Sequence, residues 1–126
     1  MAYPRMQLTA TVLNAPDPQS LGRFYSQLLG WPIETDEADW VTVRPPDGSA
    51  GLSFQTEDIY VPPVWPAAPG EQQMQMHLDI FVDDLDASVA RAIGLGATQA
   101  DFQPQDDVRV MLDPDGHPFC LFREGG

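Results

Sequence analysis

One predicted strand in the second half of the chain carries two side chains suited to proton transfer or ligand binding. One residue separates His77 from Asp79, so the two share a face of that strand. Histidine titrates near neutral pH, and a neighbouring carboxylate can orient its imidazole. The pairing is typical of an acid/base site, and a partly buried histidine bonded to a neighbour is the plain alternative. For Asp79, the alternative to orienting His77 is a salt bridge to Arg109.

Cys120 is the single cysteine of the chain. It lies between Phe119 and Leu121, a setting that favours a small buried hydrophobe over a reactive thiolate. One cysteine cannot form an internal disulfide, which suits a reducing compartment. We therefore expect a cytoplasmic protein.

The elements that must position these residues are predicted to occur twice. Asp17 followed by Pro18 is a helix start, and Asp84 caps a second helix at the corresponding place in the second half. Pro-Asp-Gly turns at 46–48 and 114–116 are 68 positions apart, almost the same separation as the 67 positions between the two aspartates. The pattern predicts an α+β domain over residues 1–126. It contains two βαβββ modules, 1–55 and 75–126, joined by a linker, 56–74.

Alternation along the strands predicts two kinds of sheet face. Twelve apolar side chains are expected to face the helices: Val41, Val43, Leu52, Phe54, Leu78, Ile80, Val82, Val108, Val110, Leu112, Phe119 and Leu121. The opposite faces are expected to line a cavity, with His77 and Asp79 as the catalytic candidates. The candidate ligand contacts there are Trp40, Thr42, Ser53, Arg109, Met111 and Cys120.

The linker has no regular pattern. Its prolines at 62, 63, 66 and 69 exclude a helix or a central strand. A connection of this length is either a functional cover or a connector between halves. Trp65 within it either lies over the cavity opening or pins the segment to the surface.

The charge balance limits the partners. The net charge is −13, with 19 acidic residues against six arginines. Such a chain does not bind nucleic acid or anionic membranes by bulk electrostatics. No apolar run approaches the ~20 residues of a membrane span, and no secretory signal is visible. We expect a small-molecule ligand, with no nucleic-acid or membrane partner.

Several motifs together resemble the vicinal oxygen chelate superfamily, which includes glyoxalase I, extradiol dioxygenases and bleomycin-binding proteins. They are the paired βαβββ module and three short stretches: Phe24-Tyr25 with Leu28-Leu29-Gly30, His77-Leu78-Asp79 with Val82-Asp83-Asp84, and Asp113-Pro114-Asp115-Gly116-His117. The resemblance covers nearly the whole chain. It implies a cupped, barrel-like mixed sheet with helices outside, and a homodimer.

Members of that superfamily typically hold a divalent metal on the first and last strands of each half. The corresponding positions here are Ala10 (or Thr9), Ser53, His77 and Cys120. Alanine and serine are poor ligands for such an ion, so we expect no metal cofactor.

Two functions follow. The resemblance favours a glyoxalase/bleomycin-resistance-like protein that binds a small molecule without a complete catalytic metal site. The alternative is an enzyme of the vicinal oxygen chelate type (a lyase, isomerase or dioxygenase) that uses His77 as acid/base or metal ligand.

Overall fold

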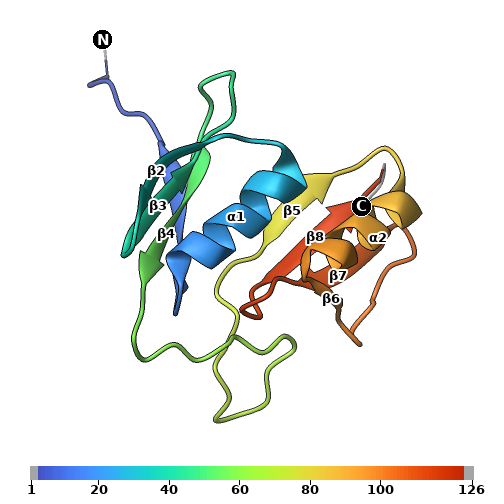
Figure 1. Ribbon diagram of the computed structural model, residues 1–126. Helices are drawn as coiled ribbons and strands as arrows, with labels where there is room; N and C mark the ends of the chain where they lie inside the picture. Colours follow the sequence, from blue (N-terminus) through green and yellow to red (C-terminus); the bar gives the residue numbers. More distant parts are fainter. Residues whose placement is uncertain (1–2, 124–126) are drawn as a thin grey trace. The chain divides into compact units, whose positions relative to one another are not determined.

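The computed structural model describes residues 3–123 and contains the βαβββ order twice (Figure 1). The first series is β1 (Ala10–Ala15), α1 (Pro18–Leu29), β2 (Ile33–Glu37), β3 (Trp40–Val43) and β4 (Gly51–Thr56). The second series is β5 (Leu78–Phe81), α2 (Leu85–Leu95), β6 (Thr98–Gln99), β7 (Val108–Leu112) and β8 (Pro118–Phe122).

Each series forms its own four-stranded mixed sheet. The strand orders are β1-β4-β3-β2 and β5-β8-β7-β6, with one parallel pair at the start of each and antiparallel pairs after it. The predicted α+β class and the duplicated module are confirmed. Neither sheet closes into a barrel within residues 3–123.

The chain divides into two compact units, Met1–Asp58 and Ile59–Gly126. The division falls inside the predicted linker, so most of the proline-rich segment belongs to the second unit. Tyr60 and Trp65 from this segment contact other residues of that unit. The segment is therefore part of the second module's structure.

The helix caps are those expected from the sequence. The Asp17 carboxylate accepts the Ser20 N–H, and the Asp84 carboxylate accepts the Ala87 N–H. Gly96 ends α2 with a positive φ, whereas Gly94, also expected to end it, lies inside the helix. In the described part of the chain, neither helix is both long and apolar enough to cross a membrane.

The first module buries the predicted face of its sheet against α1. Tyr25 stacks on Phe54 with ring centroids 5.7 Å apart, and both side chains are fully buried. Val41 is also fully buried. Gly22 allows α1 to approach the sheet here, because a Cβ at this position would lie 2.5 Å from Val41 Cγ1.

The prediction for β7 was wrong about which face each residue occupies. Val110 pairs with Cys120 across the β7–β8 ladder, so Val108, Val110 and Cys120 project from one side and form an apolar cluster. Arg109 and Met111 project from the opposite side. Met111 is fully buried there, so both sides of β7 carry buried apolar side chains and hydrophobic alternation does not distinguish them.

The two helical glycines should respond oppositely to alanine. We expect Gly22→Ala to lower the free energy of unfolding by about 1–3 kcal/mol, because the new methyl group overlaps the buried Val41 side chain. Gly94→Ala should raise it by about 0.5–1 kcal/mol, since nothing lies within 4 Å of the new Cβ. Urea unfolding of both variants measures the difference, and a stabilised Gly22→Ala protein would contradict the close packing.

Candidate functional site

Neighbouring strands of the second module bring three of the predicted site residues together: His77, Asp79 and Cys120. Asp79 of β5 pairs with Cys120 of β8, and Cys120 pairs with Val110 of β7. Paired residues on neighbouring strands project to the same side of a sheet. His77 directly precedes β5 and lies two residues before Asp79, so its side chain lies on the same side of the sheet as those of Asp79, Cys120 and Val110.

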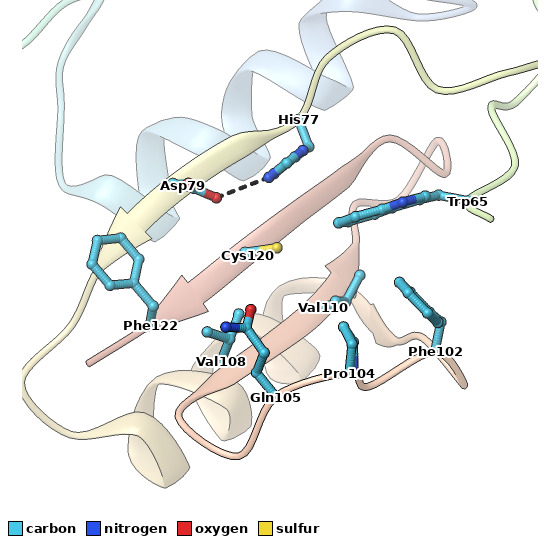
Figure 2. Close-up of a pocket in the computed structure, with 10 residues that line it drawn as sticks. All are labelled: Trp65, His77, Asp79, Phe102, Pro104, Gln105, Val108, Val110, Cys120 and Phe122. Atoms are coloured by element: carbon cyan, nitrogen blue, oxygen red, sulfur yellow. Dashed lines mark ion pairs between the residues drawn. The ribbon is translucent and has the colours of Figure 1, made fainter. Parts of the chain in front are cut away.

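His77 and Asp79 contact each other directly. His77 Nε2 lies 3.1 Å from Asp79 Oδ1 (Figure 2). The alternative partner, Arg109, donates through Nη1 to the carbonyl oxygens of Asp106 and Val108. Asp79 is therefore placed to orient the imidazole, and its side chain remains 62% exposed and available to a ligand.

A hollow of about 240 Å³ opens beside this pair, and ten residues of the second unit line it. They are Trp65, His77, Asp79, Phe102, Pro104, Gln105, Val108, Val110, Cys120 and Phe122 (Figure 2). We call it the module-two pocket. Val108, Val110 and Cys120 form its buried apolar floor. Its polar side chains are His77, Asp79 and Gln105.

Aromatic side chains form one wall of the pocket. Trp65 stacks on His77 with ring centroids 4.8 Å apart, and it packs edge-to-face with Phe102 with ring centroids 5.4 Å apart. Gln103 holds the loop that carries Phe102. Its side-chain amide donates to the Ala100 and Val110 carbonyls and accepts the Val110 N–H, as a short extra strand would.

The thiol on the pocket floor is protonated at neutral pH. Burial, and secondarily the Asp79 carboxylate, raise the pKa of Cys120 from 9.0 to about 11. A thiol in this state is a poor nucleophile. The expectation of a buried, unreactive cysteine agrees with this setting, since its exposed fraction is 4%.

Three of the lining residues also have the chemistry of a metal-binding set. One ligand atom from each of His77, Asp79 and Cys120 lies within 4.8 Å of the others. Imidazole, carboxylate and thiolate are donors that zinc and related divalent ions accept, and three protein donors leave a coordination position open. The set fits such an ion if the Cys120 thiol loses its proton on binding.

The remaining predicted ligand contacts lie elsewhere. Arg109 and Met111 are on the other side of β7 and do not line the module-two pocket. Thr42 and Ser53 pair with each other on the first module's sheet, on the side away from α1. Trp40 lies on that side too, and Thr42 Oγ1 accepts the Thr35 N–H. These three belong to the first unit.

Several pocket residues were not among the predicted contacts: Trp65, Phe102, Pro104, Gln105, Val108, Val110 and Phe122. Trp65 was predicted either to lie over the cavity opening or to pin the proline-rich segment, and the structure places it in the pocket wall. The two valines were assigned to the helix side, because β7 alternates apolar residues with arginine and methionine.

The Cys120 environment predicts slow alkylation. At pH 9 a thiol with a pKa near 11 has a thiolate fraction about fiftyfold lower than one at its ordinary value. Iodoacetamide should therefore label the folded protein far more slowly than the urea-unfolded chain.

The pKa of Cys120 also links stability to pH. Because this pKa is higher in the folded chain than in the unfolded chain, the contribution of the thiol to stability holds below pH 9 and is lost as the pH rises through about 11.

Asp79→Asn should lower the pKa of Cys120 and speed its labelling at pH 9, since it removes a nearby negative charge. Asp86→Asn, on α2, is the matched control and should leave the rate unchanged. Identical pH–rate profiles for Asp79→Asn and the unaltered protein would contradict the electrostatic coupling.

Comparison with known proteins supports this fold independently. A family model described as "Glyoxalase-like domain" matches residues 10–122. A search of the curated proteins finds no match.

Solved structures show the same fold. A glyoxalase/bleomycin resistance protein/dioxygenase family enzyme from Burkholderia phytofirmans has a TM-score of 0.72 at 19% identity, covering 94% of this chain and 98% of that one. A glyoxalase/bleomycin resistance protein from Albidiferax ferrireducens has a TM-score of 0.64 at 19% identity, covering 92% of this chain and 97% of that one. A glyoxalase-related enzyme from Fulvimarina pelagi has a TM-score of 0.66 at 19% identity, covering 95% of this chain and 89% of that one.

Identities this low establish the shared fold alone. The family match spans both βαβββ modules, from the start of β1 to the end of β8, and agrees with the resemblance to the vicinal oxygen chelate superfamily. The chain belongs to the glyoxalase-like domain family.

Proposed function

We propose that the protein binds a compact small molecule in the module-two pocket. The observation that carries this proposal is the combination of a buried apolar floor, an aromatic wall and one polar edge around a single hollow. Ligand sites in proteins commonly combine apolar surface with a few oriented polar groups. A volume of about 240 Å³ suits a ligand of roughly one or two rings.

The charges around the pocket favour a ligand with a cationic or hydrogen-bond-donating group. The Asp79 carboxylate is exposed at the pocket edge, and neither arginine nor lysine is among the lining residues. The net charge of −13 adds a long-range attraction for cations. The ligand's apolar part would lie on Val108 and Val110, with its polar group toward Asp79.

Benzamidine and benzamide test this class, because they have nearly the same shape and differ in charge. We expect benzamidine to bind more tightly, by up to about fivefold, as expected for one exposed ion pair. Tryptophan fluorescence titration measures binding, and Trp65→Phe should remove the response.

Asp79→Asn should abolish the preference for benzamidine while leaving benzamide binding unchanged. Asp83→Asn, outside the pocket lining, is the control with the same change in net charge. If neither compound perturbs Trp65 at millimolar concentration, or if the preference survives Asp79→Asn, the proposed ligand class is wrong.

A second candidate is an enzyme that acts on such a molecule, since the His77–Asp79 contact and the three-donor set both favour it. In the metal-free form, His77 would exchange a proton with the ligand while Asp79 holds its ring. In the metal form, His77, Asp79 and Cys120 would hold a divalent ion, which when bound would polarise a ligand oxygen. Two of the solved relatives are described as enzymes.

Cobalt(II) is a direct probe of the metal form. We expect Co²⁺ to bind with an absorption band from thiolate-to-cobalt charge transfer and with release of about one proton, because the Cys120 thiol must ionise. Spectrophotometric titration in weak buffer with a pH indicator measures both.

Cys120→Ser should remove the charge-transfer band, and His77→Ala should weaken binding at least tenfold. Asp83→Asn is a control, because that carboxylate is outside both the donor set and the pocket lining. Binding of Co²⁺ without a thiolate band, or binding that survives both substitutions, would place the ion elsewhere and overturn this candidate.

A further inference from the structure

A second histidine–carboxylate pair lies in the turn between β7 and β8. Asp113 is fully buried, and its carboxylate lies 2.8 Å from His117 Nδ1. The same carboxylate accepts the backbone N–H groups of Asp115 and His117 at 2.9 and 3.0 Å. These bonds fix both the shape of the turn and the orientation of the imidazole. The other ring nitrogen, Nε2, therefore points in a defined direction.

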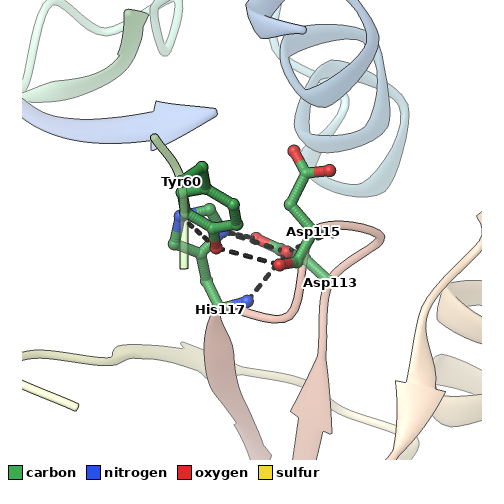
Figure 3. Close-up of polar contacts among 4 residues, drawn as sticks. All are labelled: Tyr60, Asp113, Asp115 and His117. Atoms are coloured by element: carbon green, nitrogen blue, oxygen red, sulfur yellow. Dashed lines mark hydrogen bonds and ion pairs between the residues drawn. The ribbon is translucent and has the colours of Figure 1, made fainter. Parts of the chain in front are cut away.

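Tyr60 lies next to Nε2. Its hydroxyl lies 3.2 Å from His117 Nε2 and donates to the Asp115 carbonyl at 2.9 Å (Figure 3). The two rings are 5.3 Å apart. Burial, together with the Asp113 and Asp115 carboxylates, raises the pKa of Tyr60 above its ordinary value, so the hydroxyl remains a donor.

Backbone packing provides a separate contact between the same two segments. Gly116 has a φ of +94°, and a Cβ added to it would lie 3.0 Å from Pro62 Cβ. Pro62 therefore lies close against a turn position that only glycine suits. We call the contacts of Tyr60 and Pro62 with residues 113–117 the turn clamp.

The turn clamp holds the chain immediately before the pocket wall. Trp65 follows Pro62 by three positions and stacks on His77. Beyond it, the Val64 N–H donates to the Gln72 carbonyl at 2.7 Å, which closes the rest of the segment into a loop. The turn itself leads directly into β8, which carries Cys120. The turn clamp thus joins the wall of the pocket to its floor.

We infer that Tyr60 and His117 are positioning residues for the module-two pocket: they hold the segment whose Trp65 side chain completes the pocket wall against His77. The role in ligand binding rests on the proposed function. The placement of Trp65 does not, and it can be measured without a ligand.

The two contacts of the His117 ring can be removed separately. His117→Asn retains a nitrogen near the Nδ1 position, so it keeps the bond to Asp113 and loses the contact with Tyr60. His117→Gln places its amide nitrogen near Nε2, so it keeps the Tyr60 contact. Tyr60→Phe removes the hydroxyl and preserves the ring.

The protein labelled with 5-fluorotryptophan gives a fluorine NMR signal for each of Trp31, Trp40 and Trp65, and Trp65→Phe assigns the third. We expect Tyr60→Phe and His117→Asn to shift or broaden the Trp65 signal while the other two keep their positions. His117→Gln should restore it toward its original position. Circular dichroism establishes that each variant remains folded.

The same variants should bind benzamidine up to about fivefold more weakly, as expected for the loss of one partly buried hydrogen bond. An unchanged Trp65 signal in folded Tyr60→Phe and His117→Asn proteins would overturn the positioning role. If the Trp65 signal shifts as expected and benzamidine binds none of the proteins, the positioning role stands and the proposed ligand class fails. A general disturbance of all three tryptophan signals would also overturn the inference, because it would show a loss of fold.

Discussion

Backbone register across β5, β8 and β7 is the constraint on which the candidate site depends. The parallel β5–β8 pairing sets Asp79 beside Cys120, and the antiparallel β8–β7 pairing sets Val110 on the other side of the thiol. A shift of one residue in either ladder would turn a whole strand's side chains to the opposite face. The polar edge and apolar floor of the pocket are thus two consequences of one hydrogen-bonding pattern.

The second module uses the same pair of residue types in two different ways. The His77–Asp79 pair is partly exposed and borders a hollow, so its polar groups are accessible from outside. The His117–Asp113 pair is shielded, with the carboxylate fully buried and bonded to backbone N–H groups. The two pairs differ in burial and in the number of fixed hydrogen bonds, although they consist of the same residue types.

The duplicated fold does not imply duplicated chemistry. Ala10 of β1 and Ser53 of β4 occupy the places in the first module that His77 and Cys120 occupy in the second. Asp79 adds a third donor on the same sheet face. A shared fold does not fix a shared function, so the local donor set determines what this chain can bind.

The sequence by itself determined the duplicated βαβββ order, the aspartate caps of both helices and the shared face of His77 and Asp79, because each depends on contacts within a few residues. Only the tertiary structure decided that Val108 and Val110, rather than Arg109 and Met111, line a pocket. Strand alternation identifies a buried face only when the other face is polar. Here the face that carries Val108, Val110 and Cys120 is covered by Trp65 of the proline-rich segment. This contact joins residues far apart in the chain.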